Sequence, residues 1–281
     1  RYYMSLNNQK ILGISVTTDK KEIILEDIKE GLSVFAQSRH QPPGKRRKPR
    51  IVVTPNPEQI MYARKHKQFR DILNQADVAL PDGIGLVWAA RFLGDKTSGT
   101  TDGETITRIP GVEFMEDLVQ DAAKRGVRIG LIGGFTGLAV KALECLQGAY
   151  PSLMGWAEDG PALQGADETV IEDIEASYWR RLAEKIVKTK TGIVFVGLGA
   201  PKQEYFIYRL TQELSAPVVC MSVGGSFAIF ANKLKRAPLF IRSIGFEWFW
   251  RLLQEPWRVR RQFQLFRFIV LVFRTKFLHP R

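Results

Sequence analysis

The sequence predicts an α/β fold, a Rossmann-like and mostly parallel sheet with helices on both faces, followed by a basic amphipathic helical appendage at the C-terminus. Short apolar, β-branched runs end in Gly or Asp and alternate with segments of helical period, which is typical of such sheets. The formal net charge of +12 gathers toward the C-terminus, which sets that part of the chain apart. The 281 residues are 45% hydrophobic and can bury a substantial core, so a wholly disordered polycation is excluded.

The predicted strands and helices alternate along the first part of the chain. The strands are expected within KILGISV at 10–16, RIVVTPN at 50–56, ADVALPDG at 76–83, RIGLIGG at 128–134, GIVFVGLG at 192–199 and PVVCMSVGG at 217–225. The helices between them are expected to include 111–124, 136–150, 178–190 and 202–214. Three polar stretches without a clear period, 41–49, 95–107 and 155–172, are predicted to be loops. Because ligands bind outside the carboxyl ends of the strands in such sheets, we expect the functional residues there.

The charge divides the chain at Asn232. From that residue to the C-terminus there are 12 Lys and Arg and only two acids, Glu247 and Glu255, which leaves +10. The first 231 residues hold 29 bases and 27 acids, although a basic stretch at 39–50 has six bases and no acid. We therefore expect an α/β domain over 1–231 and an appendage over 232–281. The asymmetry indicates a polyanionic partner, which is a nucleic acid, an anionic membrane surface or a phosphate-rich ligand.

The appendage has the composition of a helix that lies in a membrane interface. One helix is expected from Pro238 to about Gln254, and after a break at Pro256 a second is expected over 257–277, with apolar residues at three- and four-residue steps. Its longest uninterrupted apolar run, 268–273, is far shorter than the ~20 residues that a spanning helix needs. Arginines recur every seven residues along one border of the apolar stripe: Arg260, Arg267 and Arg274. These features favour a membrane surface. The alternative is an ordinary amphipathic helix that docks on the body or on another subunit.

Common nucleotide and metal motifs are absent from the sequence. It has no GxxxxGK[ST] motif, which excludes a P-loop ATPase, and no Asp-x-Asp pair. The three histidines, His40, His66 and His279, are far apart, and no cysteine or histidine cluster has the spacing of metal ligands. Cys145 and Cys220 lie in apolar stretches and form no disulfide framework, so a reducing compartment fits best. We expect no metal and no cofactor, and arginines as the groups that neutralise any phosphate.

Asp82 is the strongest candidate for acid–base chemistry. It ends a predicted strand and is followed by Gly83 and Gly85, which permit a close backbone approach. A carboxylate at this edge of a sheet can accept a proton from a sugar hydroxyl. The alternative is that Asp82 is the N-cap of the following helix. Thr54 and Asn56, which end the preceding strand, either bind a sugar or serve as turn and cap residues.

Two glycine-rich strand ends are candidate ligand contacts. Gly133 and Gly134 follow a strand and open a helix, so their backbone amides could hold a phosphate. A tight turn with close helix packing is an equally open interpretation. At the next glycine-rich end, Gly199 precedes Lys202, which could bind phosphate, and Gln203, which could bind ligand hydroxyls. An exposed first helical turn is the alternative there.

Together these stretches resemble a known family. TPNPEQI, LPDGIGLVWA, RIPGVEF, GLIGG, VFVGLGAPKQEYFI, VGGSF and KRAP…GFEWFWRLLQEPWRVRRQ occur in this order and are similar to the TagA/WecG/CpsF glycosyltransferases, glycosyltransferase family 26. The resemblance runs from about Arg50 to Gln262. It implies a metal-independent, inverting transfer of an N-acetylmannosamine-type sugar from a UDP donor to an undecaprenyl-diphosphate-linked acceptor. It further implies a peripheral enzyme on the cytoplasmic face of the bacterial membrane that makes a cell-surface polysaccharide.

The resemblance also implies roles for individual residues. Asp82 matches the proposed general base, Thr54 and Asn56 match polar residues beside it, and Gln203 matches the glutamine of the PKQE motif. Further residues are expected at the UDP diphosphate: Arg251, Arg258 and Arg261 from the appendage, with Gly133, Gly134, Gly199 and Lys202. An inverting transfer needs a base on the acceptor hydroxyl and cations on the departing diphosphate, and the arginine fork suits phosphate oxygens.

Four features depart from the family pattern: the loop 95–107, the acidic insert near 158–175, the basic loop 39–50 and a tail that continues past the usual end. They bear on the donor and acceptor more than on the reaction type. The alternatives are a nucleic-acid-binding protein that uses the basic tail, a related transferase with another UDP-hexose donor, and a scaffold that has lost activity. The expected partners are a UDP-sugar, a polyprenyl-diphosphate-linked acceptor, an anionic membrane surface and a second copy of the chain, with no nucleic acid.

Overall fold

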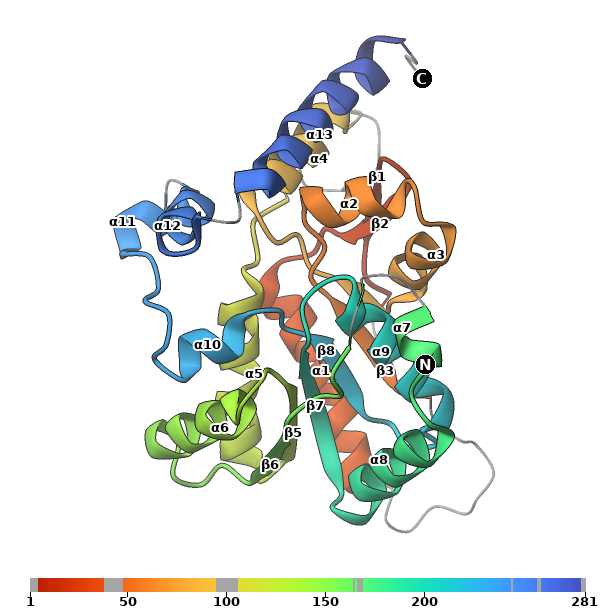
Figure 1. Cartoon of the computed structure of the whole chain (residues 1–281), viewed down its shortest axis with the longest axis vertical. Helices are drawn as coiled ribbons and strands as arrows, with labels where there is room; N and C mark the ends of the chain where they lie inside the picture. The colour runs from red at the N-terminus through yellow and green to blue at the C-terminus, as the bar shows by residue number, and fades with distance from the viewer. Residues whose placement is uncertain are drawn as a thin grey trace.

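The computed structural model describes residues 5–37, 48–94, 106–163, 165, 169–243, 245–256 and 259–278. Within them lies a parallel six-stranded sheet with the strand order β4-β3-β8-β7-β5-β6. Its strands are β3 (Arg50–Val53), β4 (Val78–Ala79), β5 (Arg128–Gly133), β6 (Gly155–Glu158), β7 (Thr191–Gly197) and β8 (Val219–Ser222). Helices cover both faces of the sheet, which confirms the predicted Rossmann-like α/β class (Figure 1).

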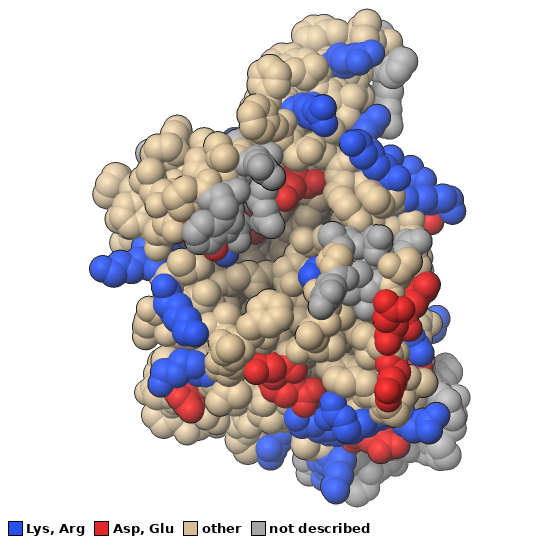
Figure 2. Space-filling view, in the orientation of Figure 1, with Lys and Arg blue, Asp and Glu red and all other residues tan. Residues whose placement is uncertain are grey.

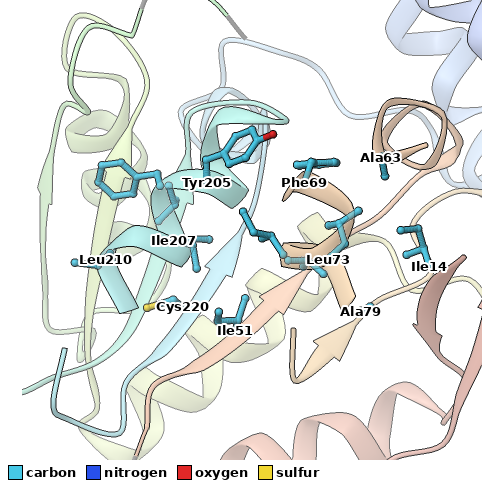
Figure 3. Close-up of a cluster of buried hydrophobic side chains, with 14 of the residues drawn as sticks. Ile14, Ile51, Ala63, Phe69, Leu73, Ala79, Tyr205, Ile207, Leu210 and Cys220 are labelled. Atoms are coloured by element: carbon cyan, nitrogen blue, oxygen red, sulfur yellow. The ribbon is translucent and has the colours of Figure 1, made fainter. Parts of the chain in front are cut away.

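The two faces of the sheet bury separate cores because successive side chains of a strand point to opposite sides. Val52 and Phe195 pack on one face, whereas Val53 and Val196 pack on the other. The first face is covered by α1 (Lys21–Gln37), α5 (Gly111–Arg125), α6 (Leu138–Ala149) and α10 (Ser226–Phe230). The second is covered by α2 (Pro57–Ala63), α3 (Lys67–Gln75), α4 (Ile84–Leu93), α7 (Thr169–Glu172), α8 (Ala176–Lys188) and α9 (Lys202–Glu213). Figure 3 shows part of this second core, where helical residues such as Phe69 and Leu210 gather above Ile51 and Cys220.

The N-terminal run predicted as one strand at 10–16 is a hairpin, so that prediction was wrong. β1 (Asn8–Ile11) and β2 (Ile14–Thr17) pair antiparallel around a turn at Leu12 and Gly13. Both turn residues have positive φ, 50° and 90°, which is the geometry of the turns that join tight hairpins. The Thr17 hydroxyl accepts a hydrogen bond of 3.1 Å from the Ala79 N–H, which holds the hairpin against the β4 edge of the sheet.

The stretch predicted as a loop at 155–172 contains the edge strand β6 and the short helix α7, which corrects that prediction. The residues of β6 are all partly exposed, so the strand has no buried apolar run that a sequence pattern could reveal. Its position depends on a neighbour: a Cβ at Gly130 would lie 2.6 Å from the Trp156 ring, so only glycine allows this ring to cross β5. The other two predicted loops, 41–49 and 95–107, lie almost entirely outside the described residues.

The C-terminal segment forms α11 (Leu239–Ser243), α12 (Glu247–Gln254) and α13 (Val259–Leu278). The single helix predicted from Pro238 to Gln254 is therefore interrupted, and Gly245, with a φ of +79°, lies between its two parts. The helix predicted over 257–277 corresponds to α13, which packs on α2 and α4 (Figure 1). Within the described residues, no helix has the length and apolar character that a membrane crossing requires. The functional division at residue 232 stays a prediction.

Candidate active site

The carboxyl ends of β3, β4, β7 and β8 open into one cavity of about 1120 Å³. Each strand end contributes a wall residue: Thr54 follows β3, Asp82 follows β4, Gly199 follows β7 and Gly224 follows β8. The opposite wall comes from the C-terminal helices, including Arg251 of α12. Figure 2 shows the recess that opens between these helices and the body of the molecule. The structure therefore brings the predicted residues Thr54, Asp82 and Gly199 together with Arg251 of the C-terminal segment.

Asp82 lies half-buried in the wall of this cavity. Burial raises the pKa of its carboxyl to about 6, and the nearby Glu247 adds to the rise, whereas Arg108, Arg251 and the Gly111 N–H oppose it. The N-cap of α4 is Gly83 rather than Asp82, so the cap interpretation of Asp82 was wrong. A carboxyl with a pKa of about 6 is mostly ionised at neutral pH and is still basic enough to accept a proton.

Thr54 is nearly buried, with its hydroxyl 3.5 Å from the Ser222 carbonyl oxygen. The start of α5 lies directly against it, since a Cβ at Gly111 would be 2.9 Å from the Thr54 methyl carbon. Asn56 is the N-cap of α2, and its side-chain oxygen accepts a hydrogen bond of 3.0 Å from the Gln59 N–H. The Gln59 side chain in turn accepts one of 3.0 Å from the Asn56 N–H, which completes a capping box. Asn56 thus lines the cavity and also fixes the start of α2.

Gln203 lines the cavity and belongs to a buried hydrogen-bonded group in its wall. Its side-chain oxygen accepts a hydrogen bond of 2.9 Å from the Gly224 N–H, and its nitrogen donates one of 2.8 Å to Glu204. Gln59 donates to the same Glu204 oxygen at 3.1 Å. Both ends of the Gln203 amide are therefore bonded to the protein, which ties the Gly224 turn to α2. The sequence prediction missed the fully buried Glu204, whose pKa burial raises to about 7.

Arg251 reaches from α12 onto the turn after β8. A Cβ at Gly225 would overlap its guanidinium, so the glycine lets the guanidinium lie directly against this turn. Its Nε donates a hydrogen bond of 2.9 Å to Glu255. Arg251 lines the cavity at this edge of the sheet, and its role at the UDP diphosphate stays a prediction. Arg258 lies outside the described residues, and Arg261 is part of α13 but its side chain is not among those described.

Two further arginines line the cavity, and the sequence prediction missed both of them. Arg108 donates from Nη2 to Glu247 at 2.5 Å and from Nη1 to the Arg242 carbonyl oxygen at 3.4 Å. Arg236 pairs with Glu113 at 2.5 Å and lies 3.7 Å from Glu247. Both arginines stand in motif stretches, RIPGVEF and KRAP, which was the available signal. In the part of the chain that the structure describes, no group of three or more His, Cys, Asp or Glu is arranged to hold a metal ion.

Three of the remaining predicted residues lie apart from this group. Among the described residues that line the cavity, Gly199 is present, whereas Gly133, Gly134 and Lys202 are not. A Cβ at Gly133 would lie 2.7 Å from backbone atoms of the neighbouring β7, and the Gly134 N–H already donates to a β7 carbonyl oxygen at 3.2 Å. The Lys202 ammonium donates to the Leu163 carbonyl oxygen at 2.7 Å. Close packing therefore accounts for the two glycines.

An acid of raised pKa beside arginines, at the carboxyl edge of a doubly covered parallel sheet, suits an enzyme that transfers groups from phosphate-bearing donors. Residues 33–281 match the model of the glycosyl transferase WecG/TagA/CpsF family, and the chain belongs to that family. The protein is therefore a glycosyltransferase, as the resemblance predicted.

Named relatives support this assignment. A Bacillus spizizenii protein is 29% identical over 222 residues, which cover 79% of this chain and 78% of the relative. A Staphylococcus aureus protein is 32% identical over 211 residues, which cover 75% of this chain and 74% of the relative. Both are named N-acetylglucosaminyldiphosphoundecaprenol N-acetyl-beta-D-mannosaminyltransferase.

Proposed function

We propose that the protein transfers N-acetylmannosamine from a UDP donor to an N-acetylglucosamine that is linked to undecaprenyl diphosphate, the reaction in its relatives' names. The observation that carries the proposal is Asp82, which lines the same cavity as Arg108 and Arg251 and interacts electrostatically with both. One carboxylate and several arginines are the groups that such a transfer requires. The product belongs to the synthesis of a cell-surface polysaccharide.

In the proposed reaction Asp82 accepts the proton of the attacking acceptor hydroxyl. The hydroxyl oxygen forms a bond to the anomeric carbon from the side opposite the diphosphate, so the configuration inverts. The bond between the anomeric carbon and the diphosphate oxygen breaks, and its electron pair leaves with UDP. Arg108 and Arg251 stabilise the charge that develops on the diphosphate, and one well-placed donor of this kind contributes about 3 kcal/mol to lowering the barrier. We propose that these arginines act without a metal ion.

The C-terminal segment supports a further part of the proposal, which is association with the cytoplasmic face of an anionic membrane. Large apolar side chains of this segment are exposed: Leu239, Phe240, Phe246, Trp248, Phe249, Leu253, Phe263 and Phe266. In Figure 2 the lobe that contains α11 and α12 is mostly free of acidic side chains. Arg267, Arg274 and Lys276 of α13 are the cations we assign to lipid headgroups. On this proposal 1–231 is the catalytic domain, and 232–281 closes the site and contacts the membrane.

A donor panel tests the proposal. UDP-N-acetylmannosamine, its uronic acid, UDP-N-acetylglucosamine and UDP-glucose are each offered with N-acetylglucosaminyl diphosphate undecaprenol, with and without EDTA. We expect UDP release and a disaccharide-lipid product with the first donor, unchanged by EDTA, and at least a hundredfold loss in Arg251→Ala. Turnover of another donor in its place would reject the N-acetylmannosamine assignment, and loss of turnover in EDTA would reject the arginine-only mechanism.

A further inference from the structure

The cavity has two ends of different chemistry. Asp82, Arg108 and Arg251 form the polar end. The other end, which we call the apolar branch, is lined by residues of α2, α4 and α13. Its apolar residues include Met61, Tyr62, Trp88, Leu265 and Ile269, and the polar residues Glu58, Gln59 and Gln264 also line it. Figure 1 shows these three helices side by side at one end of the molecule. A sugar nucleotide carries no long apolar chain, whereas this branch presents several apolar side chains in a row along its wall.

The helices that line the apolar branch are fixed to one another by buried contacts. Phe268 and Val272 of α13 are fully buried in the core and anchor the helix on α2 and α4. The three helices approach one another at Gly85, where a Cβ would lie 3.1 Å from Pro57 and 3.3 Å from Leu265. This anchoring turns Leu265 and Ile269 of α13 toward the cavity.

A row of aromatic side chains, which we call the aromatic track, leads from the apolar branch to the surface and consists of Trp88, Phe92, Phe273 and Phe277. Trp88, in the cavity wall, stacks on Phe92 with ring centres 5.3 Å apart and contacts Phe273 at 5.6 Å. Phe92 contacts Phe273 at 5.0 Å and Phe277 at 6.2 Å. Phe277 is 68% exposed near the end of α13. The contacts therefore join the catalytic cavity to an exposed aromatic end of the helix that we assign to the membrane.

We propose that the apolar branch binds the first isoprene units of the lipid-linked acceptor and that the aromatic track receives the chain beyond them. The inference rests on the proposed function. In the acceptor of the relatives' names, one diphosphate joins the sugar to the polyprenol. When the sugar hydroxyl is at Asp82, the chain must therefore begin close by, on the far side of that diphosphate. Lys65, on the border of the branch, is the cation for the acceptor diphosphate.

The test compares two acceptors with the same N-acetylglucosaminyl diphosphate head, one with undecaprenol and one with a short water-soluble alkyl chain, assayed in detergent. Ile269→Asn places a polar group in the branch, and Met61→Asn does the same from α2. We expect each variant to lower kcat/KM for the long-chain acceptor at least tenfold. The rate with the short-chain acceptor and the KM of the donor should change less than twofold. The conservative variant Ile269→Leu should keep the wild-type rate with the long-chain acceptor.

Val270→Asn is the matched control, since Val270 is the next residue of α13, is 43% exposed and does not line the cavity. It should leave the ratio of the two acceptors unchanged, and thermal unfolding should show that all variants fold. An equal loss with both acceptors, or an unchanged ratio in Ile269→Asn and Met61→Asn, would overturn the lipid branch. Failure of the wild-type protein with both acceptors would instead reject the proposed function.

Discussion

Asp82→Asn should abolish transfer and at the same time stabilise the fold at neutral pH. Burial raises the pKa of Asp82 from 3.8 to about 6. A shift of this size corresponds to about 3 kcal/mol of preference for the protonated form. Because the folded protein binds this proton more tightly than the unfolded chain, its stability falls as the pH rises from 3.8 through about 6 and stays lower above that range. Asparagine has the shape of the protonated acid without its charge, so the variant avoids this loss.

Urea unfolding at two pH values measures the effect. The variant should be more stable than wild type by about 3 kcal/mol at pH ~7.5, and by only about 1 kcal/mol at pH ~4.5, where much of the wild-type carboxyl is protonated in the folded state. Glu26→Gln, on the exposed side of α1, is the control and should change stability by less than about 0.5 kcal/mol. A variant that is no more stable than wild type at the higher pH, or an equal gap at both values, would refute the electrostatic reasoning. In the wild type, kcat/KM should fall about tenfold per pH unit below the pKa.

Substitutions at four further positions test the site and the strand ends around it. Glu113→Gln removes the charged partner of Arg236. In steady-state kinetics this variant should raise the KM of the donor several-fold. In urea unfolding it should change the free energy of unfolding by no more than about 1 kcal/mol. Glu204→Gln should keep activity, because burial already raises the pKa of this carboxyl to about 7 and an amide replaces the protonated acid. Glu204→Leu, in contrast, leaves the side-chain amides of Gln59 and Gln203 without their acceptor. This variant should lower the free energy of unfolding by about 3 kcal/mol. Gly133→Ala, at φ +124° against backbone atoms, should lower the melting temperature more than Gly137→Ala, at φ +75° in open space.

The central strands and helices were predictable because their apolar residues face buried cores on both sides of the sheet. Predicted helices such as 111–124 and 202–214 end within one residue of α5 and α9. The features that were missed depend on single glycines or on neighbours distant in sequence. The edge strand β6 depends on Gly130, which makes room for Trp156, and the break between α11 and α12 occurs at Gly245. The spacing of apolar residues along the sequence does not indicate such contacts.

The site was predictable where a polar residue follows a strand, as Asp82 and Thr54 do, because parallel strands all end at one edge. It was not predictable where a side chain comes from an unrelated element. Arg108 precedes a helix and meets its partner Glu247 139 residues later in the chain. Glu204 sits one residue from the predicted Gln203, yet only the folded structure shows that it is buried and bonded to Gln59.

The net charge of the C-terminal segment does not by itself distinguish a nucleic-acid partner from a membrane partner, because its cations lie in different surroundings. Arg236 and Arg242 both pair with Glu113, and Arg251 pairs with Glu255, so acidic side chains of the protein itself already balance the charge of these three cations. Arg267 and Arg274, in contrast, are exposed on α13. The same helix supplies Leu265 and Ile269 to the apolar branch. On the proposed function, one helix, α13, both contacts the lipid headgroups and lines the cavity. Binding to the membrane therefore also fixes the direction from which a lipid-linked acceptor reaches Asp82.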